Sequence, residues 1–193
     1  MTQTDQNPAT DPVVANLDRA VLDEVIHEVK LNSDVLFTWD YDQSRPALKK
    51  LYEKGKTSQW NATTDLPWDT EVDPEKLGAE AAAQNQRFNI LHNHPDSPLK
   101  NWGEKEWHKA SIETQTGILS QFLHGEQGAL ICTGLITATV PWIDAKYYAA
   151  TQVMDEARHV EVFAKYLDEK IANHYPINTH LKLLLDDIIE DSR

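Results

Sequence analysis

The sequence predicts an all-α fold, a bundle of helices, from two observations. Apolar residues recur at helical spacing in four segments, which cover about residues 13–31, 103–138, 144–173 and 179–191. No segment shows the strict alternation of apolar and polar residues that is typical of a half-buried strand.

The N-terminal part divides into a tail and a first helix. Residues 1–12, MTQTDQNPATDP, lack the basic and apolar regions of a secretory signal, and we expect a disordered tail. The helical domain then extends over residues 13–193. Its first helix, Val13–Leu31, is amphipathic and carries a Glu-x-x-His pair, Glu24 and His27, on its polar side, so this pair is interpreted as solvated surface.

A short helix and a long irregular segment follow. Pro46 in a first turn predicts a helix over Arg45–Lys56. The segment Thr57–Asn101 is rich in tryptophan and proline, and only Glu75–Ile90 has a helical pattern. An irregular segment of this length is usually functional or packed on a core, and its tryptophans favour packing.

Three further helices are predicted, over Gly103–Ala138, Asp144–Asn173 and Thr179–Asp191. We expect the chain to reverse at Val140–Trp142, so that the two long helices form an antiparallel hairpin.

Composition excludes several classes of function. The chain has 193 residues and a net charge of -13, which disfavours nucleic acid and anionic membrane surfaces as partners. Cys132 is the single cysteine, so an internal disulfide and a cysteine-based zinc site are excluded, and a packed thiol in the reducing cytoplasm is expected. No apolar run reaches the roughly 20 residues of a membrane span.

One carboxylate stands out in the first long helix. Glu126 is the only formally charged residue between Thr114 and Ile143. It falls near the centre of an apolar face, so we expect it in the interior. That face is set by Ile118, Leu119, Phe122, Leu123, Ala129, Leu130 and Ile136. A buried carboxylate must be protonated, paired with a cationic side chain or bound to a metal ion.

The second long helix offers partners for Glu126. Glu156 and His159 lie one turn apart on its apolar side, a spacing that lets both bind one metal ion. Pro141 stands fifteen residues from Glu126 and fifteen from Glu156, so a hairpin brings both glutamates to the same height. The adjacent Asp155 and Arg158 are predicted to hydrogen-bond the ligands.

The other histidines are weaker candidates. His92 and His94 lie in a proline-rich loop without acidic or thiol partners at a ligand spacing, so polar loop surface is the interpretation. His124 faces away from Glu126 and is predicted to be exposed or to hydrogen-bond at the surface.

The motifs HGEQGA and DEARH, thirty residues apart, resemble the ferritin-like di-iron carboxylate superfamily, which includes ribonucleotide reductase small subunits. The wider sequence around these motifs is most similar to bacterial, largely actinobacterial, ferritin-like proteins without an assigned substrate. The resemblance implies terminal iron ligands at Glu126 and His159, a bridging carboxylate at Glu156, and Asp155 and Arg158 around them. It implies two irons, or a manganese–iron pair.

The chain departs from the superfamily in two ways. The superfamily's site takes a glutamate from each of two helices and a Glu-x-x-His from each of two others, and this sequence supplies half of that set. Either the chain is truncated, or a homodimer completes the site. Phe163 occupies the position, one turn beyond His159, where a radical-bearing tyrosine often lies, which disfavours a stored tyrosyl radical.

The resemblance implies a non-haem di-iron oxidase or oxygenase that uses dioxygen to oxidise a small-molecule substrate. The substrate and the electron donor stay open. Two alternatives are an iron-binding protein of the ferritin type and a metal-free helical interaction module, in which Glu126 is protonated or held by Arg158.

Overall fold

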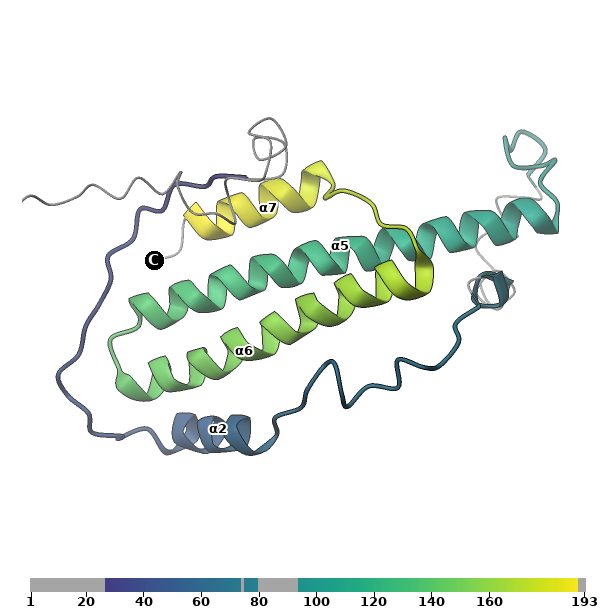
Figure 1. The fold of residues 1–193 in the computed structure, drawn as a ribbon. Coiled ribbons are helices and arrows are strands. Elements are labelled where there is room, and N and C mark those ends of the chain that lie inside the picture. The colour runs from purple at the N-terminus through teal and green to yellow at the C-terminus, as the bar shows by residue number, and fades with distance from the viewer. Residues whose placement is uncertain (1–26, 74, 80–93, 191–193) are drawn as a thin grey trace, which may run out of the picture. The chain divides into compact units, whose positions relative to one another are not determined.

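A computed structural model describes residues 27–73, 75–79 and 94–190 (Figure 1). The chain divides into two compact units, Met1–Leu31 and Asn32–Arg193. In the first unit the described residues 27–31 are irregular, so the predicted helical end near Leu31 is wrong. The remainder of that predicted helix, and the predicted tail over residues 1–12, lie outside the described residues.

The second unit is helical, and none of its described residues forms a strand, which confirms the all-α class. Figure 1 shows its elements, which are α2 (Pro46–Thr57), α5 (Glu104–Thr139), α6 (Ile143–Tyr166), the π-helical turn η2 (Leu167–Ile171) and α7 (Thr179–Glu190). Residues 75–79 are also helical, and residues 80–90 of the helix predicted there lie outside the described residues. None of the described helices is long and apolar enough to cross a membrane.

Local sequence signals set the helix ends. The backbone N–H of Gly103 donates to Glu106 Oε2 (2.9 Å), one turn into α5. The N–H of Leu181 donates to Asn178 Oδ1 (2.9 Å), which caps the start of α7. After η2, Ala172 adopts a left-handed backbone conformation, φ 55°, which ends the continuous helix formed by α6 and η2.

Helices α5 and α6 form the predicted antiparallel hairpin, with the reversal at Val140–Trp142 (Figure 1). Lys146 Nζ, in the first turn of α6, donates to the backbone oxygens of Thr137 (2.9 Å) and Ala138 (3.3 Å) at the end of α5. The Leu36 N–H also donates to the Ala138 oxygen (2.9 Å). The last carbonyls of α5 are therefore satisfied by groups outside that helix.

Helix α2 packs on α6, and helix α7 packs on α5. Gly55 lies so close to α6 that a Cβ atom there would be 3.0 Å from Thr151 Cβ. Gly128 approaches α7 more closely still, because a Cβ atom would overlap the side chain of Leu185 and lie 3.1 Å from its Cγ. Both contacts use the missing side chain of a helical glycine to bring two helices together.

The segment before α7 is fastened to α5 by side-chain hydrogen bonds. Ser120 Oγ accepts from the Tyr175 N–H (2.9 Å), and Gln121 Oε1 accepts from the Asn178 N–H (2.8 Å). His124 Nε2 lies 2.9 Å from the Tyr175 oxygen. The prediction that His124 is a surface hydrogen-bonding residue is confirmed.

The tryptophans of the irregular segment pack on cationic side chains of α6. The Arg158 guanidinium lies 5.0 Å from the centre of the Trp60 ring, and Lys165 Nζ lies 4.5 Å from that of Trp68. Ala62, between the two tryptophans, is buried, and its oxygen accepts from Trp68 Nε1 (2.6 Å). The packing role predicted for the tryptophans of this segment is confirmed for its described part.

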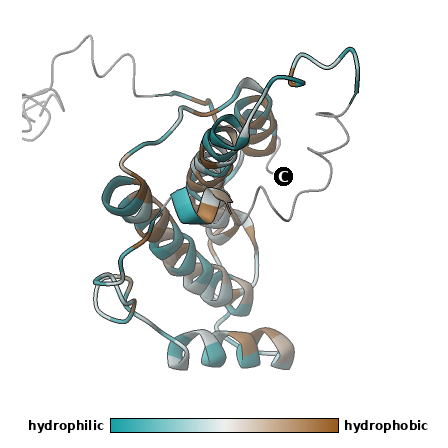
Figure 2. Cartoon of the chain, turned by 90° about the vertical axis from the view of Figure 1, so that its right-hand side faces the viewer, coloured by the Kyte–Doolittle hydropathy of each residue, from teal (hydrophilic) through white to brown (hydrophobic). Residues whose placement is uncertain are grey.

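The apolar interior of the unit is small. Its buried apolar residues among those described are Ala62, Ala149, Leu167 and Ile189. The hydropathy colouring in Figure 2 shows hydrophobic and hydrophilic residues mixed along the helices. Ile118, Phe122 and Ile136 of α5, predicted to line the core, are exposed instead. That prediction is wrong for these three residues, which keep about half of their surface accessible, and Phe122 does so although its ring stacks on Phe163 of α6.

Candidate metal centre

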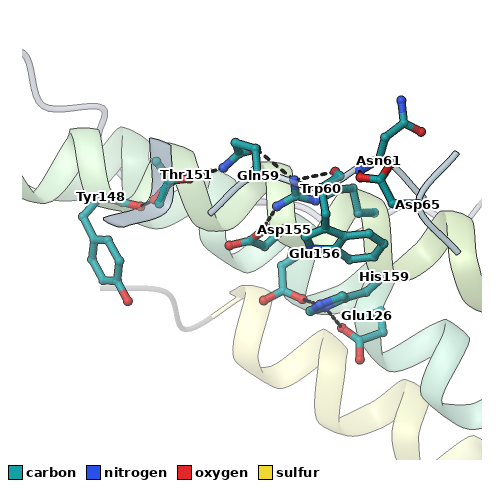
Figure 3. Close-up of polar contacts among 12 residues, drawn as sticks. Gln59, Trp60, Asn61, Asp65, Glu126, Tyr148, Thr151, Asp155, Glu156 and His159 are labelled. Atoms are coloured by element: carbon teal, nitrogen blue, oxygen red, sulfur yellow. Dashed lines mark hydrogen bonds and ion pairs between the residues drawn. The ribbon is translucent and has the colours of Figure 1, made fainter. Parts of the chain in front are cut away.

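The hairpin brings together the three predicted ligand residues. Glu126 comes from the middle of α5, and Glu156 and His159 come from facing positions on α6. One ligand atom from each side chain lies within 4.8 Å of the other two. Figure 3 shows the carboxylates of Glu126 and Glu156 turned towards the imidazole of His159. Within the described residues, this is the one cluster of three or more residues able to ligate a metal ion.

Two carboxylates share one nitrogen in this cluster. His159 Nδ1 lies 3.1 Å from Glu126 Oε2 and 3.2 Å from Glu156 Oε2. In the neutral imidazole that nitrogen carries at most one hydrogen, which cannot satisfy two carboxylates fully. Among the described residues, His159 is the only basic side chain that forms an ion pair with either glutamate. The cluster therefore has an excess of negative charge.

The three side chains are partly buried. The exposed fraction is 25% for Glu126, 18% for Glu156 and 43% for His159. Glu126 was predicted to be in the interior, but it faces α6 at the edge of the helix contact and keeps some access to solvent. The cluster thus keeps some contact with solvent.

The electrostatics of the cluster favour a proton or a cation. Burial raises the pKa of Glu156, the hydrogen bond with Glu126 raises that pKa further, and the contact with His159 opposes both effects. The raised pKa means that a second negative charge beside Glu126 is harder to accommodate than an ordinary carboxylate in water. A bound metal ion would offset this charge directly.

The donor set suits a divalent transition metal. Carboxylate oxygens are hard ligands and the imidazole nitrogen is a borderline one, a combination that accommodates Fe²⁺, Mn²⁺ or Zn²⁺. Three donors fall short of the four to six that these ions take, and the exposure of the cluster would let water supply the others.

Arg158 and Asp155 lie next to the ligands in sequence but take part in another network. Arg158 is buried and donates to Gln59 Oε1 (2.8 Å), to the Trp60 oxygen (3.0 Å) and to Asp155 Oδ1. Among the described residues, neither side chain hydrogen-bonds a member of the cluster. The predicted contacts with the ligands are therefore missing from the structure, because the Arg158 side chain faces Gln59 and Trp60 of the irregular segment. The alternative that Arg158 holds Glu126 is wrong.

An aromatic pair flanks the cluster and was not predicted as part of it. The rings of Phe122 and Phe163 are stacked, with their centres 5.9 Å apart. Phe122 precedes Glu126 by four residues and Phe163 follows His159 by four residues, so each ring lies one turn from a ligand. This spacing, together with the predicted hairpin, could have indicated the contact.

The remaining histidine candidates lie elsewhere. His27 and His94 are exposed, in agreement with their interpretation as surface residues, and His94 Nδ1 accepts from the Asp96 N–H (3.2 Å). Glu24 and His92 lie outside the described residues.

Comparison of the chain with models of protein families, with curated proteins and with solved structures finds no match. The resemblance to the ferritin-like superfamily therefore stays a prediction that rests on the motifs HGEQGA and DEARH.

Proposed function

We propose that the protein is a non-haem iron oxidoreductase of the di-iron type. In this proposal Glu126, Glu156 and His159 bind iron, and the oxidised product is formed from a small organic molecule and dioxygen. The observation that carries the proposal is the convergence of two carboxylates on one imidazole, without a cationic side chain to balance them, in the described part of the chain.

The roles of the side chains follow from their chemistry. Bound iron would supply the reaction with dioxygen, and the protein would supply the ligands and their orientation. The two carboxylates offset the charge of the cation, and the imidazole of His159 supplies a neutral nitrogen ligand. The stacked rings of Phe122 and Phe163 give the neighbourhood of the ligands an apolar wall, which suits an apolar part of a substrate.

The proposal places the protein in the cytoplasm as a bacterial enzyme. This rests on the single cysteine, Cys132: burial raises the pKa of its thiol, which favours the protonated form, and a free thiol of this kind suits a reducing compartment.

One observation favours a second candidate, a metal-free helical interaction module. Several large apolar side chains of α5 and α7 are exposed, as a docking surface requires. Iron storage of the ferritin type, by contrast, has no specific observation in its favour beyond the ligands that it shares with the leading proposal.

Anaerobic titration with Fe²⁺, followed by removal of unbound metal and iron analysis, separates these functions. We expect the wild-type protein to retain iron and the Glu156→Ala variant to retain little or none. Glu161→Ala is the matched control, because Glu161 lies on the exposed side of the same helix, where it accepts from Thr63 Oγ1 (3.0 Å). A wild-type protein that retains no more iron than Glu156→Ala supports the module instead.

Oxygen then tests the reaction class. Exposure of the iron-loaded protein to air should consume dioxygen and change the optical spectrum as iron is oxidised. An iron-loaded protein that consumes no dioxygen would be an iron-binding protein and not an oxidoreductase.

A further inference from the structure

The side of α5 next to Glu126 carries a regular stripe of apolar and small residues. The spacing between successive members is four, three, four, three and four residues, which is the spacing of a helix that pairs with another along its length. The members are Ile118, Phe122, Gly125, Ala129, Cys132 and Ile136.

This stripe is accessible to a partner. The exposed fractions of Ile118, Phe122 and Ile136 are 46%, 54% and 46%, which are high for residues at the core positions of a helix pair. At Gly125, in the middle of the stripe, no atom of the described residues lies within 4 Å of an added Cβ atom. The small residues at the centre would let a second helix approach closely.

The stripe is symmetric about its centre. When it is laid against a second copy in the opposite direction, Ile118 faces Ile136, Phe122 faces Cys132, and Gly125 faces Ala129. The outer positions of the stripe thus pair isoleucine with isoleucine and phenylalanine with cysteine, and the central positions pair glycine with alanine. Such self-complementarity is what a twofold interface between identical chains requires.

The charge distribution also favours a second copy. Each chain carries a net charge of -13, and two copies repel each other over most of their surface. The window Thr114–Ile143, which contains the whole stripe, has Glu126 as its single formally charged residue. Pairing through the stripe therefore brings together the least charged part of the molecule, with two glutamates beside the axis.

We propose that a second copy of this chain binds antiparallel along the stripe of α5 and completes a two-metal site with its own Glu126, Glu156 and His159. A twofold axis through the centre of the stripe, perpendicular to the plane of the two α5 helices, keeps both Glu126 side chains on one side of that plane. Both α6 helices lie on that side too, because His159 of α6 contacts Glu126. The six side chains then face one region.

The completed set has a known chemistry. Two-metal carboxylate sites in four-helix bundles take one glutamate from each of two helices and a Glu-x-x-His from each of two others. Two α5 and two α6 helices supply that set. The inference rests on the proposed function for the identity of the ligands, and it adds a second copy of the chain as the partner.

The first test compares two isoleucines of α5. Ile136 belongs to the stripe and Ile131 does not, yet their exposed fractions, 46% and 45%, are nearly equal. Molar mass is measured by sedimentation with Fe²⁺ under argon, and bound iron is counted in the same samples. We expect wild-type protein and Ile131→Lys to form pairs with two irons, and Ile136→Lys to stay single and bind iron at least tenfold more weakly.

The outcomes separate the two proposals. Iron bound by single wild-type chains, or pairing by Ile136→Lys equal to that of Ile131→Lys, overturns this inference and leaves the proposed function intact. A wild-type protein without bound iron overturns the proposed function, and with it the inference.

The second test is independent of the folding of the lysine variants. In a Cys132→Ser background, the double variant Gly125→Cys/Ala129→Cys should form disulfides between two chains after mild oxidation, because positions 125 and 129 face each other across the axis. The matched control is Gln127→Cys/Ile131→Cys, which has the same spacing on another side of α5. Equal cross-linking of the two double variants would contradict the antiparallel arrangement.

Discussion

Arg158 and His159 are neighbours in sequence on α6, yet they lie in opposite kinds of environment. The Arg158 guanidinium is buried and has three partners, Gln59, Trp60 and Asp155. His159 is 43% exposed, and its Nδ1 atom lies within hydrogen-bonding distance of two carboxylates. Arg158 donates from both of its terminal nitrogens, although its buried Nε has no hydrogen-bond partner among the described residues, whereas the two carboxylates beside His159 form no ion pair there with any other cationic side chain. This difference identifies the cluster, and not the arginine network, as the candidate site.

Removal of Arg158 should have the largest effect on stability. Arg158→Ala leaves the Trp60 oxygen and Asp155 without their donor and opens a cavity under Trp60, so we expect a loss of about 3 kcal/mol in the free energy of unfolding. Urea denaturation of the metal-free protein measures this loss. The iron content of the folded variant should equal that of wild type. Loss of iron at unchanged stability would instead assign Arg158 to the metal site.

Substitutions at two glycines of α5 should change the stability by smaller amounts and in opposite directions. An added Cβ at Gly128 would overlap Leu185 of α7, whereas one at Gly125 meets nothing within 4 Å. Gly128→Ala should therefore destabilise the metal-free protein by about 1–3 kcal/mol. Gly125→Ala should stabilise it by up to about 1 kcal/mol, because alanine favours the helix. Chemical denaturation of both variants checks the opposite signs, and equal signs would refute the docking of α7 at Gly128.

Neutralisation of one carboxylate should have the smallest effect on stability, and its sign depends on pH. Because the pKa of Glu156 is raised in the folded protein, ionisation of this group costs stability as pH rises above its ordinary value of 4.5. Glu156→Gln should therefore be more stable than wild type at pH 7 without metal, and this advantage should vanish below pH 4. Thermal unfolding at several pH values measures it.

The control for this experiment is Glu161→Gln, which makes the same change of charge on the exposed side of α6. An advantage of Glu156→Gln that persists at low pH would show that the pKa of Glu156 is not its cause. Glu156→Gln should also lose the ability to bind iron. A variant that is more stable than wild type but binds no iron would show that Glu156 serves metal binding and not stability.

Periodicity predicted most of the fold and the core of the candidate site. The helices α2, α5 and α7 agree with their predicted bounds to within one or two residues, and α6 with η2 ends two residues early. The equal distances of Glu126 and Glu156 from Pro141 predicted their meeting, because hairpin geometry depends only on counting residues.

Contacts with irregular segments were beyond such counting. Arg158 meets Gln59 and Trp60, which precede it by almost a hundred residues in a segment without a helical period. The position of α7 depends on the fit between Gly128 and Leu185, which no pattern of apolar residues indicates. Exposure of Ile118, Phe122 and Ile136 could not be predicted either, because their spacing suits a core and an interface equally well.

The turn between α5 and α6 is stabilised by hydrogen bonds with residues outside the turn. Lys146 holds the last carbonyls of α5, Leu36 adds a backbone hydrogen bond, and Asp144 Oδ2 accepts from the Arg45 N–H (3.0 Å). Peptide continuity at Pro141 is thus one of several constraints on the alignment of the two helices. A circularly permuted protein, with new termini opened at this bend, should keep helices α5 and α6 in the same alignment.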